Sequence, residues 1–496
     1  MLKEINRRKR MKPTTKWLAL AVAATFAVSC AKSEDAAAAS STVSNPVCTP
    51  SETIEGIITA NKTIAANACV AIRGKVEVNS GVTLTVNAGA RVLASTSTLS
   101  YILVKRGGII TAIGTDTNPV IFTSGGNQGS RNPSDWGGIV IHGKSATNNT
   151  ASADYATDSE IFTGPYGCGD AGNACAGTLG NTDNSGTLQY VRIEFAGREI
   201  ASGKEFNGLF LAGVGSGTTI DHVQFHRGSD DGIEIFGGAV NVNYALITNN
   251  QDDAFDVDEG WRGTARYIVA AVPKDGDQGI EYDGVGADAN RSTNAKLSNF
   301  TILGSYNKTV EGIISVRASG TMELDNSYIA HVWGANGVIA VAANSITNAG
   351  NTPATNYGAS FDLRFQSNVI ECAFTNATFT TAKTTADSLF CSGANQPAGC
   401  VANTLAVTFP DGNTNNVTTN LACTTPSLSR PSEGVLWGAT SGINEFRPTA
   451  AITATYADPA AAPNGTDMAT ATFIGAFQNQ TDNWGTTMGW VSFPAN

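Results

Sequence analysis

The stretch from residue 230 to residue 284 repeats itself and decides the fold. It runs DDGIEIFGGAVNVNYALITNN (230–250), QDDAFDVDEGWRGTARYIVAAVPK (251–274) and DGDQGIEYDG (275–284). The three pieces align on DDGIE, DDAFD and DQGIE, at offsets of 22 and 25 residues. The first two pieces each hold a short strand-like core and a second apolar run, which is the content of one coil of a solenoid. The repeat therefore predicts an all-β solenoid in which each period forms one rung.

The alignment also stacks acidic side chains on consecutive rungs. We call the following set the acidic ladder: Asp230, Asp252 and Asp277 in one column, Glu234, Asp256 and Glu281 in a second, Asp258 and Asp283 in a third, with Asp231 and Asp253 beside the first. Adjacent rungs lie roughly 4.8 Å apart, and like charges at that distance repel each other. Solvent, the nearby Arg227 and Arg262, raised pKa values or a bound cation must offset this repulsion.

An oxygen-rich cluster of this kind suits Ca²⁺, which takes about six to eight oxygen ligands in loose geometry. The ladder is therefore a candidate calcium site, and no other cofactor is expected. The alternative is a solvated turn face, in which Asp side chains cap turns through hydrogen bonds.

Composition agrees with a solenoid of short strands. The chain has 53 Gly among 496 residues and only 15% charged residues, which suits many strands joined by tight turns. Residues 1–29 carry a net charge of +6, so their removal takes the formal charge from −11 to −17. An anionic surface repels nucleic acid and anionic lipid head groups, and it attracts divalent cations. No nucleic-acid partner is expected.

The N-terminus has the layout of an export signal, with basic residues up to Lys16 and an apolar run over 17–28. That run is too short to span a bilayer permanently. Its end, FAVSC (26–30), resembles the lipobox of bacterial lipoproteins. The resemblance implies lipidation of Cys30 and attachment to a membrane, at the outer membrane or the cell surface. The alternative is a cleaved secretory signal followed by an incidental Cys.

Eight Cys remain besides Cys30, an even number in an exported and therefore oxidising setting. Because short loops close most easily, the favoured disulfides are Cys48–Cys69, Cys168–Cys175, Cys391–Cys400 and Cys372–Cys423. No CxxC pattern is present to indicate a metal site built from thiols.

The expected organisation has four parts. Residues 1–29 form the signal, 30–48 the lipidated Cys and a flexible tether, 49–350 a β-helix of about ten rungs with an insertion at 144–182, and 351–496 a β-rich, disulfide-stapled C-terminal region. The closing aromatic residues of 473–493 are expected to cover the open end of the solenoid, because an uncapped end exposes sheet edges.

Several motifs together resemble a known family. They are WGGIVIHG (136–143), DNSGTLQYVRIEFAG (183–197), NGLFLAGVGSGTTIDHVQ (207–224), DDGIEIFGG (230–238), QDDAFDVDEGW (251–261) and the closing FIGAFQN (473–479) with NWGTTMGW (483–490). The set is similar to exported bacterial right-handed parallel β-helix proteins, many of them lipoproteins. The resemblance implies a fold and a location, and it brings no catalytic residues.

Two enzyme-like features need separate treatment. The stretch GIVIHGKS (138–145) matches the phosphate-binding pattern GxxxxGK[ST], but its central residues form a strand, so no nucleotide partner is expected. A polysaccharide lyase or glycoside hydrolase on the same scaffold is the alternative function. A lyase would use Ca²⁺ held by acidic side chains, with Arg227 or Arg262 as the basic residue that takes the proton. A hydrolase would use Asp253 and Asp256 as paired carboxylates, one acid and one base.

The sequence thus favours a cell-envelope lipoprotein that acts as a binding or structural module, with cations, glycans or a surface protein as ligands. Exposed Trp136, Trp261 and Trp333 lining one groove would favour sugar stacking. The enzyme alternative predicts that the insertion at 144–182 lies on the side of the acidic ladder, with at least two carboxylates of perturbed pKa.

Overall fold

The computed structural model describes most of the chain between Cys48 and Leu303 and parts of the remainder. The described residues are 48–148, 164–168, 182–273, 275–284, 292–304, 313–317, 321–330, 339–341, 363–366, 368–371, 417–420, 472–479, 482, 484 and 489–493. Predictions that fall outside these residues concern the signal, Cys30, the tether, most of the insertion, Trp333, Cys175, Cys372, Cys391, Cys400 and Cys423. Within the described residues we find no helix with the length and apolar character needed to cross a membrane.

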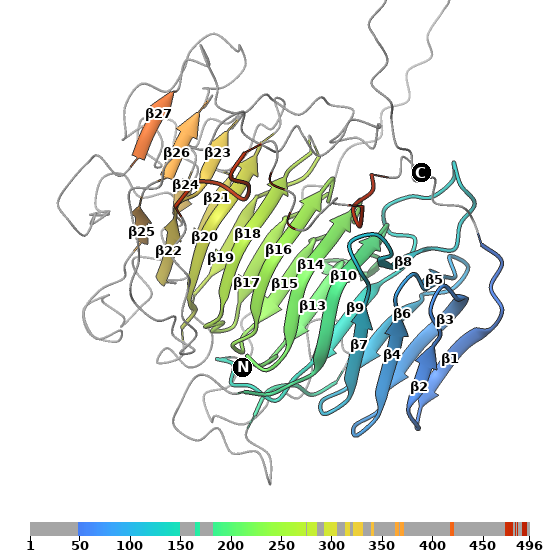
Figure 1. Ribbon diagram of the computed structural model, residues 1–496. Coiled ribbons are helices and arrows are strands. Elements are labelled where there is room, and N and C mark those ends of the chain that lie inside the picture. The colour runs from blue at the N-terminus through green and yellow to red at the C-terminus, as the bar shows by residue number, and fades with distance from the viewer. Residues whose placement is uncertain are drawn as a thin grey trace, which may run out of the picture.

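The described strands wind into a parallel β-helix with three stacks (Figure 1). Stack A consists, in order, of β1 (Thr53–Ile58), β3 (Cys69–Val78), β6 (Tyr101–Val104), β9 (Gly138–His142), β13 (Leu209–Ala212), β15 (Ile233–Phe236), β17 (Phe255–Asp258), β19 (Ile280–Asp283), β21 (Ile314–Arg317) and β24 (Ile339–Val341). These pairings are parallel, and they give the described coil ten rungs along this stack.

Stacks B and C share the long strands of the middle rungs. Both contain β10 (Gly186–Glu194), β14 (Thr219–His226), β16 (Asn241–Thr248), β18 (Thr264–Ala271) and β20 (Asn294–Leu303). Stack B adds β2 (Lys62–Ile64), β4 (Thr83–Asn87), β7 (Ile109–Ile113), β22 (Thr321–Asp325) and β25 (Leu363–Gln366). Stack C adds the first half of β3, β5 (Arg91–Ala94), β8 (Val120–Ser124), β23 (Tyr328–Ala330), β26 (Asn368–Glu371) and β27 (Val417–Asn420).

Each long strand turns from stack B into stack C at one residue with positive φ. The first four of these residues are Tyr190, His222, Tyr244 and Tyr267, with φ between 52° and 59°. Positive φ is costly for residues other than Gly. Their rings stack with centroids 4.5, 4.5 and 4.8 Å apart, which offsets part of that cost. A column of aromatic rings therefore runs along this corner of the coil.

The core is the inside of the coil, filled by alternate side chains of all three stacks. Trp136 and Trp261 belong to it and have no exposed surface. Their indole N–H groups donate to the carbonyls of Glu194 at 2.8 Å and Val240 at 3.0 Å. A groove of exposed tryptophans is therefore wrong for these two residues, because filling the coil removes more apolar surface from water than a surface position would.

The C-terminal aromatic residues also differ from the expectation. They lie along the outer side of stack C and its corner with stack B, rather than over the open end of the coil (Figure 1, red). His222 Nε2 contacts the Trp484 carbonyl oxygen at 2.7 Å, and the Gln224 side chain exchanges two hydrogen bonds with the Ser492 backbone. Trp490 packs edge-on against the ring of Tyr190. The column of aromatic rings gives this segment an apolar surface to bury.

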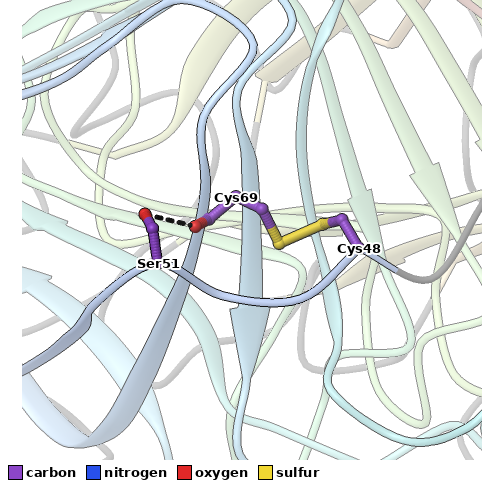
Figure 2. The surroundings of a disulfide bond; sticks show 3 residues. All are labelled: Cys48, Ser51 and Cys69. Atoms are coloured by element: carbon purple, nitrogen blue, oxygen red, sulfur yellow. Dashed lines mark hydrogen bonds between the residues drawn. A yellow bond between two sulfur atoms is a disulfide. The ribbon is translucent and has the colours of Figure 1, made fainter.

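A predicted disulfide joins the start of the folded body to the second rung. Cys48 is bonded to Cys69, and Ser51 Oγ beside it donates to the Cys69 carbonyl oxygen at 3.1 Å (Figure 2). Cys168 is disulfide-bonded too, and its predicted partner Cys175 lies outside the described residues. The bridge therefore holds Cys48 against the second rung of the coil.

Candidate metal centre

The register of stack A brings the second column of the acidic ladder together as predicted. Glu234 on β15 pairs with Asp256 on β17, and Asp256 pairs with Glu281 on β19. The register between β17 and β19 runs through Val257 and Tyr282, and Asp258 and Asp283 follow directly. The alternation of strand side chains then places the acidic groups outside and their apolar neighbours in the core.

The acidic side chains approach closely enough to share a cation. Four groups of three residues each offer carboxylate oxygens within 4.8 Å of one another: Asp230, Asp231 and Asp252; Asp231, Glu234 and Asp256; Asp252, Asp253 and Asp277; Asp253, Asp256 and Glu281. Each group shares one residue with two of the others, so the four groups form one connected cluster across three rungs. Asp231, Glu234, Asp253, Asp256 and Glu281 are between 3% and 6% exposed.

A second set of contacts ties the ladder to the backbone. Asn207 Oδ1 accepts the N–H of Asp231 at 3.2 Å, and Asp231 Oδ1 accepts the N–H of Asp253 at 2.9 Å. Asp253 Oδ1 accepts the N–H of Gln278 in the same way. Each side chain thus receives a donor from the next rung. Turn capping and ion binding are compatible here, because a carboxylate has two oxygens.

Asn207 and Gln278 are the functional residues that the sequence reasoning missed. Asn207 also donates from Nδ2 to Glu234 Oε2, so it contacts both acidic columns. The signal was present in the alignment, because NGLF (207–210) takes the place of DGIE (231–234) one rung earlier. Asn207, Asp231, Asp253 and Gln278 therefore occupy equivalent positions on four consecutive rungs, with amides at the two ends and acids in the middle.

The pKa values show what burying these acids does. Burial raises the pKa of Asp231 well above its ordinary value, and the charge of Asp230 raises it further. Burial likewise raises the pKa of Asp253, followed by the charges of Asp252 and Asp277, while the hydrogen bond from the Gln278 N–H lowers it. The ladder resists carrying all its charges at once unless a positive charge is supplied.

The two arginines proposed to balance the ladder do not lie among the groups that shift these pKa values. The Arg227 guanidinium lies 5.9 Å from the ring centroid of Phe195, and burial lowers its pKa against the opposing charge of Asp275. Burial also lowers the pKa of Arg262, whose charged neighbour is Tyr282.

The described residues of the insertion contact the same side of the coil as the ladder. Tyr166, in its described part, donates its hydroxyl to Glu259 Oε2 at 2.6 Å, just after β17. The Asn148 N–H donates to the Glu259 carbonyl oxygen at 2.8 Å. Tyr166 packs with Val140 and Phe210, apolar members of the column that Glu234 continues. The outer face of stack A therefore passes from a covered apolar strip into the acidic ladder.

Comparison with known protein families assigns the chain to one of them. A family model described as the pectate-lyase like beta helix domain matches residues 56–406. The chain belongs to this family. The match begins within β1 and includes the three strands β15, β17 and β19 that carry the ladder. Comparison with curated proteins and with solved structures returned no match.

Proposed function

We propose that this pectate-lyase-like β-helix is a lipid-anchored binding module of the cell envelope, whose acidic ladder holds Ca²⁺ and presents the outer face of stack A to a glycan or a surface protein. The observation that carries the proposal is a set of four triplets of acidic residues across three consecutive rungs. Within each triplet, carboxylate oxygens of the three residues lie within 4.8 Å of one another. An elongated flank of this kind suits an extended partner.

Calcium is the cation that the donor set fits. The ladder offers only oxygen ligands, and its five most buried carboxylates are Asp231 and Asp253 together with Glu234, Asp256 and Glu281 of the second column. Calcium accepts about six to eight oxygens at variable angles, which tolerates ligands spaced by the rung repeat. Magnesium demands near-octahedral geometry, which the fixed strand spacing does not favour.

Calcium titration of the protein tests the proposal. We expect millimolar Ca²⁺ to raise the midpoint of thermal unfolding, because a ligand that binds only the native state stabilises it. Asp256→Asn should abolish most of that rise, since Asp256 belongs to two of the four triplets of acidic residues. Asp275→Asn is the matched control, because it removes the same charge from an exposed position nearby. An unchanged midpoint in the wild-type protein would remove the calcium site.

A polysaccharide lyase or glycoside hydrolase is the second candidate, and two observations favour it. Described residues of the insertion lie on the side of the ladder, and the pKa values of Asp231 and Asp253 are both raised. The pKa of Asp253 is raised, and a carboxylate oxygen of Asp253 lies within 4.8 Å of one of Asp256. A protonated carboxyl beside a carboxylate is the pair that acid–base catalysis uses. Incubation with charged and neutral polysaccharides, followed by assay of reducing and unsaturated ends, separates the two functions. Product release that is lost in Asp253→Asn would establish the enzyme, whereas calcium-dependent glycan retention without product supports the binding module.

A further inference from the structure

The charge of the chain is divided between the two ends of the coil. Residues 48–148 hold eight basic and five acidic side chains, a net charge of +3. Residues 149–496 hold 15 basic and 34 acidic side chains, a net charge of −19. Of the second group, the described residues of 182–284 hold six basic and 17 acidic side chains. Because rungs follow one another in chain order, the charge difference between 48–148 and these rungs lies along the axis of the described coil (Figure 1). The end nearest Cys48 is therefore positive on a protein that is otherwise acidic.

Two lysines form the centre of the positive region. Lys75 Nζ lies 2.8 Å from Glu77 Oε2, and Lys105 Nζ lies 3.0 Å from Glu77 Oε1. The lysine side chains are 47% and 42% exposed, whereas that of Glu77 is 6% exposed. Burial pushes the pKa of Glu77 upward, but the hydrogen bonds from both lysines outweigh it and lower the pKa. One buried carboxylate thus carries two ammonium groups on its solvent side.

Two further cations extend this region along the outer side of stack A. Arg106 follows Lys105, and its Nε donates to the Gly167 carbonyl oxygen at 2.6 Å. Lys144 Nζ lies at the turn after β6, where it would be 3.1 Å from a Cβ at Gly107. We call Lys75, Lys105, Arg106 and Lys144 the basic flank. Its charge of +4 is opposed by Glu77 and by Asp183, whose raised pKa the charge of Lys144 opposes.

The basic flank is separated from the acidic ladder by several rungs. Lys105 follows β6, the third strand of stack A, and the ladder starts at β15, the sixth. Three rung spacings amount to roughly 14 Å. The Debye length at physiological ionic strength is about 8 Å. The ladder therefore does not cancel the attraction of the basic flank for a nearby anionic surface.

We propose that the basic flank docks on anionic lipid head groups and holds the coil with its N-terminal rungs against the bilayer. This rests on the lipid anchor proposed above, because the tether brings that end of the coil to the membrane. A flexible tether of seventeen residues, which the sequence predicts for 31–47, would span roughly 20–25 Å and would keep the first four rungs within reach of the bilayer. The excess acidic charge of the later rungs is repelled by the same surface.

Vesicle sedimentation tests the docking without the lipid anchor. The chain from Ala31 lacks Cys30 and retains every residue that the structure describes. We expect it to sediment with vesicles of phosphatidylcholine and phosphatidylglycerol, less so at higher salt, and not with phosphatidylcholine alone. Reversing both charges in Lys75→Glu/Lys105→Glu should weaken this binding at least roughly tenfold. Lys204→Glu, compared with Lys105→Glu alone, controls for the change of net charge.

A gain-of-binding variant keeps the test decisive if the double reversal fails to fold. Glu77→Gln preserves shape and adds one positive charge to the flank, so binding should strengthen by a factor of about five. Equal sedimentation of the wild-type chain, the double reversal and Glu77→Gln overturns the proposal. The anchor is judged separately, by incorporation of labelled palmitate into the full chain and its loss in Cys30→Ser, so the two ideas fail independently.

Discussion

Adding one methyl group at Gly138 is expected to cost the folded body at least about 3 kcal/mol of unfolding free energy. Gly138 has φ of +96°, and a Cβ built there would lie 2.0 Å from the Asn207 carbonyl oxygen and 2.8 Å from that of Gly208. Both obstacles are backbone atoms, so no side chain can rotate away. The two rungs would have to separate, and Asn207 would move with its contacts to the ladder.

Gly129→Ala is the matched control for Gly138→Ala. Gly129 has φ of +86°, yet a Cβ there meets nothing within 4 Å. It should cost only the backbone penalty, about 1 kcal/mol. Urea midpoints of the two variants, with the calcium response of each, measure the difference. Equal midpoints would show that rung spacing at Gly138 can relax, against the close packing proposed for strands β9 and β13.

Replacing Asp231 and Asp253 together by Asn is expected to stabilise the calcium-free protein at pH 8 by a few kcal/mol. Asn keeps the oxygen that accepts the next rung's N–H, as Asn207 does one rung earlier. What it removes is a buried charge that other carboxylates repel. The expected gain in unfolding free energy equals the cost of ionising Asp231 and Asp253 in the folded wild-type protein.

The pH dependence follows from the direction of these shifts. The pKa values of Asp231 and Asp253 are raised in the folded protein, so the native state binds more protons than the unfolded chain. Without calcium, the contribution of these two groups to stability is therefore greatest below the unfolded pKa of about 3.9 and is lost as pH rises through their folded pKa values. Other acids impose their own trend, so the comparison is with Asp231→Asn/Asp253→Asn across the same range.

Calcium should reverse the order of the two proteins. We expect the wild-type protein to gain stability from the cation and the double variant to gain little, because the variant has lost two of the carboxylates that make up the four triplets. Urea midpoints in chelator and in calcium, at pH 5 and pH 8, give the complete comparison. A double variant that is less stable in chelator at pH 8 would show that these carboxylates are structural acceptors whose charge the fold tolerates.

The order of the rungs was determined by the sequence alone. The spacing of DDGIE, DDAFD and DQGIE predicted which residues pair, and Glu234, Asp256 and Glu281 do pair in that register. A solenoid permits this because each rung contacts its neighbours in chain order, so local periodicity carries most of the topology. The short loop that closes Cys48 on Cys69 is local in the same sense.

Only the tertiary structure decided which surfaces of the coil are covered. Nothing local distinguishes an exposed Trp261 from a buried one, and the structure places it inside the coil, bonded to the Val240 carbonyl. The C-terminal aromatic residues pack against the column of aromatic rings at the corner of stacks B and C, more than 150 residues away in sequence. Burial of apolar surface depends on shape brought together across the whole chain, whereas strand register depends on repeats within it.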